Sequence, residues 1–297
     1  MKRNIIIIGA GKLAYSLTSA LVKSGYNVTS VISRKLTSAK SLARKLSIPH
    51  HSNSLKKIPD GVDVFFLTVP DGEIKKVAEK LSKLNRDFRD SICIHFSGVE
   101  NIKALKSLAK KGCATGSLHI MQTFPSKNPV IIKNSSAAIE AVNKTAILFL
   151  NKLNKKLRLK SFRISSEEKE FYHLAGVYSS NFLVGNLFNS FSLFNSKDKN
   201  AIDIFKTTSY TTLKNVFGSS PAEALSGPVD RGDLYTIKKH LDALKAEIRK
   251  SKSNHLKLLR KNYIIQSLSL LEVVKAKYGG LSSKHLQIKK LLERELK

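Results

Sequence analysis

The hydrophobic positions in the first half of the chain alternate between short apolar runs and helix-like spacings. The runs are rich in branched residues, which is typical of strands buried on both faces of a sheet. Between them, apolar residues recur every three or four positions, as in helices with one buried face. The pattern predicts strands at residues 4–8, 27–33, 62–69, 92–96, 113–120, 129–132, 137–139 and 160–164. It predicts helices at residues 12–24, 39–46, 74–84, 102–110 and 142–157.

The pattern changes near Ser165, after which no strand-like alternation returns. Ser165 offers a hydroxyl cap, and Glu168 would place an acid in the first turn of a helix. One long helix is predicted from there to about residue 194, with further helices at residues 200–217, 234–249, 256–277 and 283–295. Residues 218–233 form the one extended non-helical piece of this half.

These elements define a fold class and two domains. Strands that alternate with helices of about 10–15 residues predict crossover units and a doubly wound, mostly parallel sheet. We therefore expect an α/β, Rossmann-like domain at residues 1–164 and an all-α domain at residues 165–297.

The strongest local motif lies between the first strand and the first helix and reads Gly9-Ala10-Gly11-Lys12-Leu13-Ala14. Gly9 allows a tight turn, Gly11 lets the backbone approach a pyrophosphate, and Ala14 allows close helix packing. The helix N-terminus then offers N–H groups to the phosphates. The motif predicts a dinucleotide site that includes Lys12 and Leu13, the alternative being a tight turn without a ligand. Leu13 after Gly11-Lys12 excludes a P-loop.

The end of the second strand indicates which dinucleotide is bound. NAD sites place an acidic residue there, about 20 residues after the glycines, to bind the ribose hydroxyl. This chain has Ser33-Arg34-Lys35 instead. A hydroxyl followed by two cations favours the 2′-phosphate of NADP.

Two more strands end in residues that should face the same crevice. Val69 and Pro70 follow one strand, and Ser97 follows the strand that carries His95. In open α/β sheets ligands bind beyond the carboxyl ends of the strands, so these residues should line the nicotinamide side. His119, at the end of the next strand, is a candidate proton shuttle. For either histidine the alternative is a hydrogen-bonded structural role.

Composition narrows the class of partner. The 297 residues include 52 Lys and Arg against 22 Asp and Glu, a net charge of +30, but Lys supplies 41 of the cations. Arg is the residue that reads bases, and the lysines are scattered, so nucleic-acid binding is disfavoured. The apolar runs are too short for a membrane span or a signal peptide. Cys93 and Cys113 fit a reducing cytoplasm, and no metal-binding pattern is present.

Several motifs carry a resemblance to a known family. They are Gly9–Ala14, Thr68–Asp71, His95–Gly98, Gly116–His119 through Pro125, Tyr172–Ala175 with Ser180-Asn181, and Ala224–Pro228 with Arg231–Asp233, Thr236 and His240-Leu241. With them the chain resembles the Rossmann-like, DUF2520-type NADP oxidoreductases. That group is related to deazaflavin (F420)-dependent NADP reductases, pyrroline-carboxylate reductases and ketopantoate-type reductases.

The resemblance implies a Rossmann domain followed by a helical dimerisation domain similar to the C-terminal domain of 6-phosphogluconate dehydrogenase. It therefore implies a homodimer that binds NADP and a small-molecule substrate. One residue departs from the group's pattern, since Ile120 stands where the group usually has proline after the histidine.

The long helix allows a test of mechanism. Ketopantoate-type reductases that resemble this architecture use a lysine four residues before an asparagine, on the same helix face. Here the asparagine is Asn181, but Val177 occupies the lysine position. His173 lies two turns before Asn181 and is a candidate to supply the proton instead. The alternative is that His173 and Asn181 only form hydrogen bonds between helices.

Arg231 is the candidate for binding an anionic group of the substrate or a cofactor phosphate, because guanidinium binds such groups in a bidentate manner. The alternative is an ion pair with Asp230 or Asp233. Asp233 is a good N-cap for the next helix, with Thr236 following it.

The sequence thus predicts an NADP-dependent oxidoreductase that moves a hydride between nicotinamide and a small C=O or C=N substrate. His119, His173 and Asn181 are the candidate catalytic residues. Two alternatives stay open, a non-catalytic NADP(H)-binding sensor and a 2-oxo-acid reductase that uses histidine in place of lysine. The sequence leaves open whether F420 is the redox partner.

Overall fold

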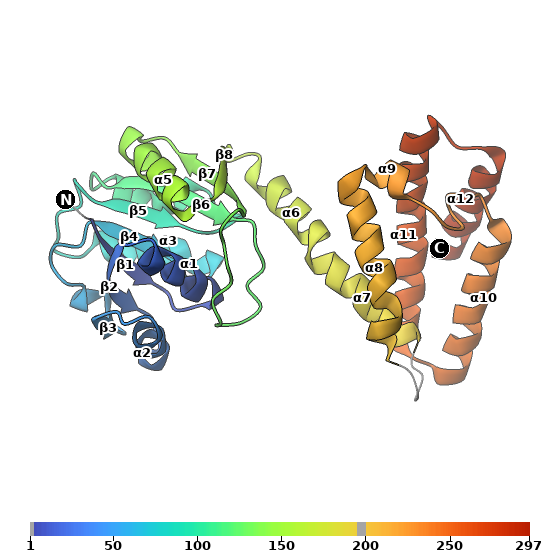
Figure 1. Ribbon diagram of the computed structural model, residues 1–297, viewed down its shortest axis with the longest axis horizontal. Helices are drawn as coiled ribbons and strands as arrows, with labels where there is room; N and C mark the ends of the chain where they lie inside the picture. Colours follow the sequence, from blue (N-terminus) through green and yellow to red (C-terminus); the bar gives the residue numbers. More distant parts are fainter. Residues whose placement is uncertain (1–2, 195–199) are drawn as a thin grey trace. The chain divides into compact units, whose positions relative to one another are not determined.

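The computed structural model describes residues 3–194 and 200–297. The chain forms two compact units, Met1–Leu183 and Val184–Lys297. The first unit is α/β and the second is helical, in agreement with the predicted fold class (Figure 1). Helix α6 (Lys169–Ser179), which follows the predicted domain boundary at residue 164, is part of the first unit.

The described part of the first unit contains an eight-stranded sheet with strand order β3-β2-β1-β4-β5-β6-β7-β8. Neighbouring strands are parallel, except that β7 runs antiparallel to β6. The strands are β1 (Asn4–Ile8), β2 (Asn27–Ile32), β3 (His50–Ser52), β4 (Val64–Leu67), β5 (Ile92–His95), β6 (Ala114–Ile120), β7 (Ser136–Ala141) and β8 (Lys160–Arg163).

Helices cover both faces of this sheet (Figure 1). Alternate residues of β1 point to opposite faces. Ile5 and Ile7 pack in a core with α1 (Lys12–Lys23), α2 (Leu36–Lys45) and α5 (Lys144–Leu157). Ile6 and Ile8 pack in a second core with α3 (Ile74–Ser82) and the segment formed by η3 (Ile102–Leu105) and α4 (Lys106–Ala109). The sheet is therefore doubly wound, as the apolar runs predicted.

At the edges of this unit one predicted strand is absent and one observed strand was missed. Pro129–Ile132, predicted as a strand, is irregular, because the Val130 N–H donates to the Ser16 hydroxyl at 2.9 Å rather than to a neighbouring strand. Conversely, the three-residue strand β3 was not predicted, because two exposed histidines give it no apolar pattern. Short 3₁₀ turns η1 (Leu55–Lys57) and η2 (Asp71–Glu73) complete the unit.

The long helix predicted from residue 165 to residue 194 is two helices. Helix α6 ends at Ser179 and α7 (Asn181–Leu193) follows directly. Ser180 between them leaves the helical conformation, with φ −130° and ψ −63°, and its hydroxyl donates to the Gly176 carbonyl at 2.7 Å. A serine that bonds the carbonyl four residues back bends or interrupts a helix.

The second unit consists of helices. They are α8 (Ala201–Gly218), α9 (Pro221–Ala224), α10 (Leu234–Ser251), α11 (Asn254–Tyr278) and α12 (Ser283–Leu296), with most of α7. Ile237, Ile264, Leu271 and Ile288 belong to a core that joins α10, α11 and α12. In contrast, none of the described residues of α7 or α8 is buried, although both helices are rich in apolar side chains.

Candidate functional site

A cavity of about 890 Å³ lies at the carboxyl ends of β1, β2 and β4. Among the residues that line it are Gly9, Ala10, Gly11, Lys12, Leu13, Ser33, Arg34, Lys35, Val69 and Pro70. All the predicted cofactor-binding residues except Ser97 therefore lie around one cavity. Its position is the place where an open parallel sheet binds ligands.

The turn between β1 and α1 is shaped by close contact with Thr68, the residue after β4. Gly9 has φ +114°, and a Cβ atom there would lie 2.3 Å from the Thr68 carbonyl oxygen. The Thr68 hydroxyl donates back to the Gly9 carbonyl at 3.0 Å. Among the described residues, no side chain caps α1 at Gly11, so the first N–H groups of the helix remain available to a ligand. A helix N-terminus in this state suits a phosphate group.

Positive charge surrounds the part of this cavity beyond β2. Arg34 follows Ser33 at the end of β2, and its exposed guanidinium lies 3.9 Å from the Glu73 carboxylate. Lys35 precedes α2, and Lys56 reaches the cavity from η1. These cations, with the Ser33 hydroxyl, fit a phosphate on the ribose better than a bare hydroxyl.

A second cavity, of about 340 Å³, collects the three predicted catalytic residues. His119 comes from β6, His173 from α6 and Asn181 from the start of α7. The other lining residues are Met121, Gln122, Thr123, Phe124, Pro125, Gly176, Val177 and Ser180. The described lining therefore offers hydrogen-bonding groups and two imidazoles but no Lys, Arg, Asp or Glu.

His119 is held by a tyrosine that the sequence had not marked as a functional residue. The Tyr172 hydroxyl lies 3.1 Å from His119 Nδ1, and the two rings meet edge to face. Burial, with the positive potential of His173 and Lys169, lowers the pKa of His119 to about 4. Burial also raises the pKa of Tyr172 to about 12. Both groups are therefore uncharged at neutral pH.

Gly98, in the loop after β5, makes room for the two imidazoles. A Cβ atom on Gly98 would lie 2.5 Å from His173 Cδ2 and 2.9 Å from His119 Nε2. Any side chain at this position would displace one ring or the other. The missing side chain of Gly98 therefore leaves room for the two rings, whose centroids lie 5.8 Å apart.

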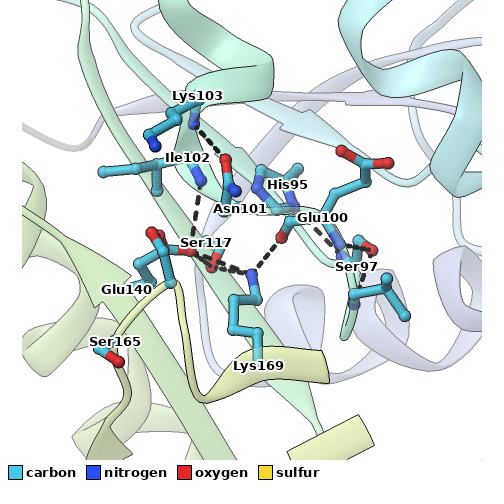
Figure 2. Close-up of polar contacts among 12 residues, drawn as sticks. His95, Ser97, Glu100, Asn101, Ile102, Lys103, Ser117, Glu140, Ser165 and Lys169 are labelled. Carbon is cyan, nitrogen blue, oxygen red and sulfur yellow. Dashed lines mark hydrogen bonds and ion pairs between the residues drawn. The ribbon is translucent and has the colours of Figure 1, made fainter. Parts of the chain in front are cut away.

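Lys169, at the start of α6, is a buried residue of this region that the sequence pattern did not reveal. Its side chain is only 1% exposed, and its ammonium donates to Ser117 Oγ at 2.9 Å, to Glu140 Oε2 at 3.1 Å and to the Glu100 carbonyl (Figure 2). Lys169 stands in a run of charged residues that reads as a solvated helix start. The available signal was Glu140, a single acid in an apolar strand, which requires a buried partner.

Ser97 and His95 have local structural contacts. The Ser97 hydroxyl accepts from the N–H groups of Val99 and Glu100 at 3.1 and 2.9 Å. His95 is fully buried, its Nδ1 accepts from the Ser97 N–H at 3.3 Å, and burial lowers its pKa to about 3. These contacts agree with the structural alternative for His95, whereas a cofactor role for Ser97 stays a prediction.

Arg231 lies in the second unit, in the loop before α10. Asp230 is paired with Lys277 at 3.0 Å, and Asp233 caps α10 by accepting from Thr236. Within the described residues, neither carboxylate forms a salt bridge with Arg231, so its role in substrate binding stays a prediction.

The described residues, 3–194 and 200–297, contain no group of three or more His, Cys, Asp or Glu side chains that could hold a metal ion. None of their helices combines the length and the apolar character needed to cross a membrane.

Two family models match the chain in tandem. Residues 4–97 match the model described as NADP oxidoreductase, coenzyme F420-dependent. Residues 135–257 match the Domain of unknown function DUF2520. These matches confirm the resemblance inferred from the motifs. Among curated proteins, none matches the chain.

Solved structures share the fold. A "putative NADP oxidoreductase" from Bacteroides fragilis is 23% identical, with 88% of this chain and 97% of that one covered and a TM-score of 0.73. A reductive aminase from Aspergillus terreus, in complex with NADPH and ethyl-5-oxohexanoate, is 12% identical over 100% and 94% of the chains, with a TM-score of 0.59. Prephenate dehydrogenase from A. aeolicus, in complex with NAD⁺ and hydroxyphenyl propionate, is 15% identical over 91% and 99%, with a TM-score of 0.55. The chain therefore has an NAD(P)-dependent oxidoreductase fold.

Proposed function

We propose that the chain is an NADP-dependent oxidoreductase that acts on the C=O or C=N bond of a small substrate. The observation that carries the proposal is a pair of cavities at the carboxyl ends of the parallel strands. The larger is built around the Gly9 turn and the uncapped helix α1. The smaller contains two imidazoles and an amide.

In this proposal the large cavity holds the cofactor. The N–H groups that follow Gly11 bind the pyrophosphate, and Ser33, Arg34 and Lys35 bind the 2′-phosphate. When bound, NADPH supplies a hydride to the substrate carbon. The π electrons of the C=O or C=N bond then move to the oxygen or nitrogen, which takes up a proton.

The small cavity would hold the oxygen or nitrogen that receives this proton. Because burial keeps His119 uncharged, we assign to it a hydrogen bond to that atom rather than delivery of the proton. His173 shares the cavity and is assigned the proton delivery. Asn181 orients the substrate through its amide. Val177 stands at the position of the lysine of ketopantoate-type reductases, and in this proposal the two histidines do the work of that lysine.

Titration of the protein with NADPH and with NADH, followed by nicotinamide fluorescence, tests the cofactor assignment. We expect tighter binding of NADPH. Arg34→Gln should weaken NADPH binding at least tenfold and leave NADH binding unchanged, because one charge-assisted contact is worth about 1.5–3 kcal/mol. Lys75→Gln, an exposed change on α3, is the matched control and should alter neither affinity. Tighter binding of NADH would contradict the NADP assignment.

A second candidate function is a nucleotide sensor that binds NADPH without turnover. Val177 in the small cavity, in place of a lysine, favours it. A panel of 2-oxo acids, neutral ketones, imines and oxidised F420, monitored by NADPH absorbance, separates the two functions. Oxidation of NADPH by any member supports the enzyme, and turnover of 2-oxo acids alone supports a ketopantoate-type activity. Binding of NADPH without oxidation across the panel supports the sensor.

We also propose that the protein is a cytoplasmic homodimer that associates through its second unit. Val184, Phe188, Ile202 and Phe217 on α7 and α8 are between 54% and 83% exposed. Apolar side chains gathered on unburied helices are typical of surfaces that bind another protein. Light scattering should give twice the mass of one chain, and Phe188→Glu with Phe217→Glu should shift it to the monomer. A monomeric mass for the unmodified chain would contradict the proposal.

A further inference from the structure

The buried Lys169 ammonium ties three elements of the first unit to helix α6. It donates to the Glu100 carbonyl in the loop after β5, to the Ser117 hydroxyl on β6 and to the Glu140 carboxylate on β7 (Figure 2). Glu140 also accepts from the Ile102 N–H at 3.2 Å. Three hydrogen bonds from one ammonium group therefore fix the first residue of α6 against the sheet.

An ion pair in this position is not needed for stability alone. The side chains of Lys169 and Glu140 are 1% and 6% exposed, so both charges have lost their hydration. Well-packed apolar residues of similar size are often at least as stabilising as such a pair. The pair supplies directional contacts instead. An ammonium group that must reach three acceptors restricts the start of α6 to a single position.

Lys169 is connected to His119 through two elements, helix α6 and strand β6. Tyr172 and His173 follow Lys169 by three and four residues, which puts all three on neighbouring positions of one helix face. Ser117 precedes His119 by two residues on β6, so both side chains stand on the same face of the sheet. Lys169 thus contacts the strand that carries His119 and positions the helix that carries its hydrogen-bond partner, Tyr172.

We propose that Lys169 is a positioning residue for His119, which rests on the function proposed above for that histidine. The network holds the Tyr172 hydroxyl against His119 Nδ1 so that the hydroxyl donates to the ring. The neutral imidazole then carries its hydrogen on Nε2, the atom on the Gly98 side where the two histidines meet. His119 then carries a fixed N–H donor where the two imidazoles meet.

The surroundings of His119 support this tautomer. Tyr172, with its pKa raised to about 12, keeps its proton and can donate it to Nδ1. The groups whose charge acts on His119 are His173 and Lys169 on α6 and Asp71 in the turn after β4. The two groups on α6 disfavour a proton on both ring nitrogens, and Asp71 favours it. Burial is the largest influence and keeps the ring neutral.

Nitrogen-15 spectra of histidine-labelled full-length protein test the proposal without a substrate. The two tautomers differ in the chemical shifts of Nδ1 and Nε2, and the His119 signal is assigned by its loss in His119→Gln. We expect one Nε2–H tautomer in the unmodified protein between pH 6 and 8. The double variant Lys169→Met with Glu140→Gln removes the tie without leaving a buried charge, and it should give a mixture of tautomers. Tyr172→Phe should give the same mixture.

Matched controls separate positioning from general damage. Lys75→Met removes an exposed lysine and should keep the single tautomer. The double variant should bind NADPH within about twofold of the unmodified protein, because neither changed residue lines the large cavity. If it does not fold, Ser117→Ala, which keeps both charges, becomes the deciding variant. A single Nε2–H tautomer in the folded deciding variant, or a mixture in the unmodified protein, overturns the proposal.

The outcome is independent of the proposed activity. Failure to bind NADPH would remove the proposed function, whereas the tautomer of His119 would still be measured. Where a panel substrate is turned over, the double variant should lower kcat about 10- to 100-fold with an unchanged KM for NADPH, as expected for a misplaced group. A rise in KM for NADPH as large as the fall in kcat would indicate a structural role only.

Discussion

At the scale of single residues, the site depends on glycines that are required for different reasons. Gly9 combines a left-handed backbone with a contact against Thr68, so both its φ angle and its missing side chain are needed. Gly98 is needed for space alone, because His119 and His173 occupy the position of a Cβ atom. A Cβ on Gly11 would have only the Thr68 carbonyl oxygen nearby, at 3.9 Å, so the protein's own packing does not require glycine there, and its proposed role is to let the pyrophosphate approach.

The two glycines of the turn before α1 should therefore separate stability from binding. Gly9→Ala should lower the free energy of unfolding by about 1–3 kcal/mol through backbone strain and collision with Thr68. Gly11→Ala should lower it by less than about 1 kcal/mol, the usual effect at an N-cap, yet weaken NADPH binding at least tenfold. Urea unfolding and fluorescence titration measure the two effects. Equal losses in both variants and both measurements would contradict the assigned roles.

The pKa of His119 predicts a pH dependence of stability. The folded pKa is about 4 and the ordinary value is 6.5, so between these values the unfolded chain binds more protons. The contribution is complete above pH 6.5 and is lost as pH falls towards 4, by about 2 kcal/mol for this partly exposed ring. Urea unfolding from pH 7.5 to 4.5 should show a shallower dependence in His119→Gln. Parallel curves for the two proteins would contradict this prediction.

Residues that belong to a sequence motif were easier to predict than residues whose role depends on a contact with a distant part of the chain. Gly9 and Arg34, which line the large cavity, were marked as candidates because a phosphate site requires a fixed spacing after a strand. Lys169 and Tyr172 were missed, because nothing near them in the sequence indicates that Glu140 and His119 lie against them. A residue whose role comes from a contact across elements is visible only once the sheet is assembled.

At the scale of elements, apolar periodicity predicted what is buried and failed at the edges. The isoleucines of β1 and the apolar face of α1 leave little choice of structure. The stretch Pro129–Ile132 has strand-like residues but no neighbouring strand to pair with, and β3 pairs despite its exposed histidines. The break at Ser180 depends on one hydroxyl that turns back to Gly176, which no hydrophobic pattern reports.

The attachment of α6 to the sheet should have a measurable stability. Lys169→Met leaves Glu140 charged and buried without its partner, which should lower the free energy of unfolding by about 3–5 kcal/mol. Adding Glu140→Gln should restore much of that loss, because no buried charge remains. Chemical denaturation of both variants measures the difference. A double variant less stable than Lys169→Met would show that the pair is not the source of the loss.

At the scale of the whole molecule, the net charge of +30 is spread over scattered lysines rather than concentrated in a site. The structure gives a role to few of these cations, mainly those around the large cavity. The remainder act together as a positive field, and such a field raises the rate at which an anion such as NADPH arrives.

That field should be visible in association kinetics. The Debye length falls from about 30 Å at 0.01 M salt to about 8 Å at 0.15 M, so distant lysines act only at low salt. Stopped-flow fluorescence should show the NADPH association rate falling several-fold over this range, with a smaller change in the dissociation rate. An association rate that does not depend on salt would show that the scattered lysines have no part in capture.

The buried pair between α6 and β7 also determines where the chain can be divided. A fragment that ends at residue 164 contains Glu140 but lacks Lys169, and so the Glu140 carboxylate loses its counterion and part of its cover. A fragment that ends at residue 183 keeps the pair and the Tyr172–His119 contact. We expect the longer fragment to unfold cooperatively on heating and the shorter one to aggregate during expression. Helix α6, although it follows the last strand, is on this view a component that the α/β unit requires in order to fold.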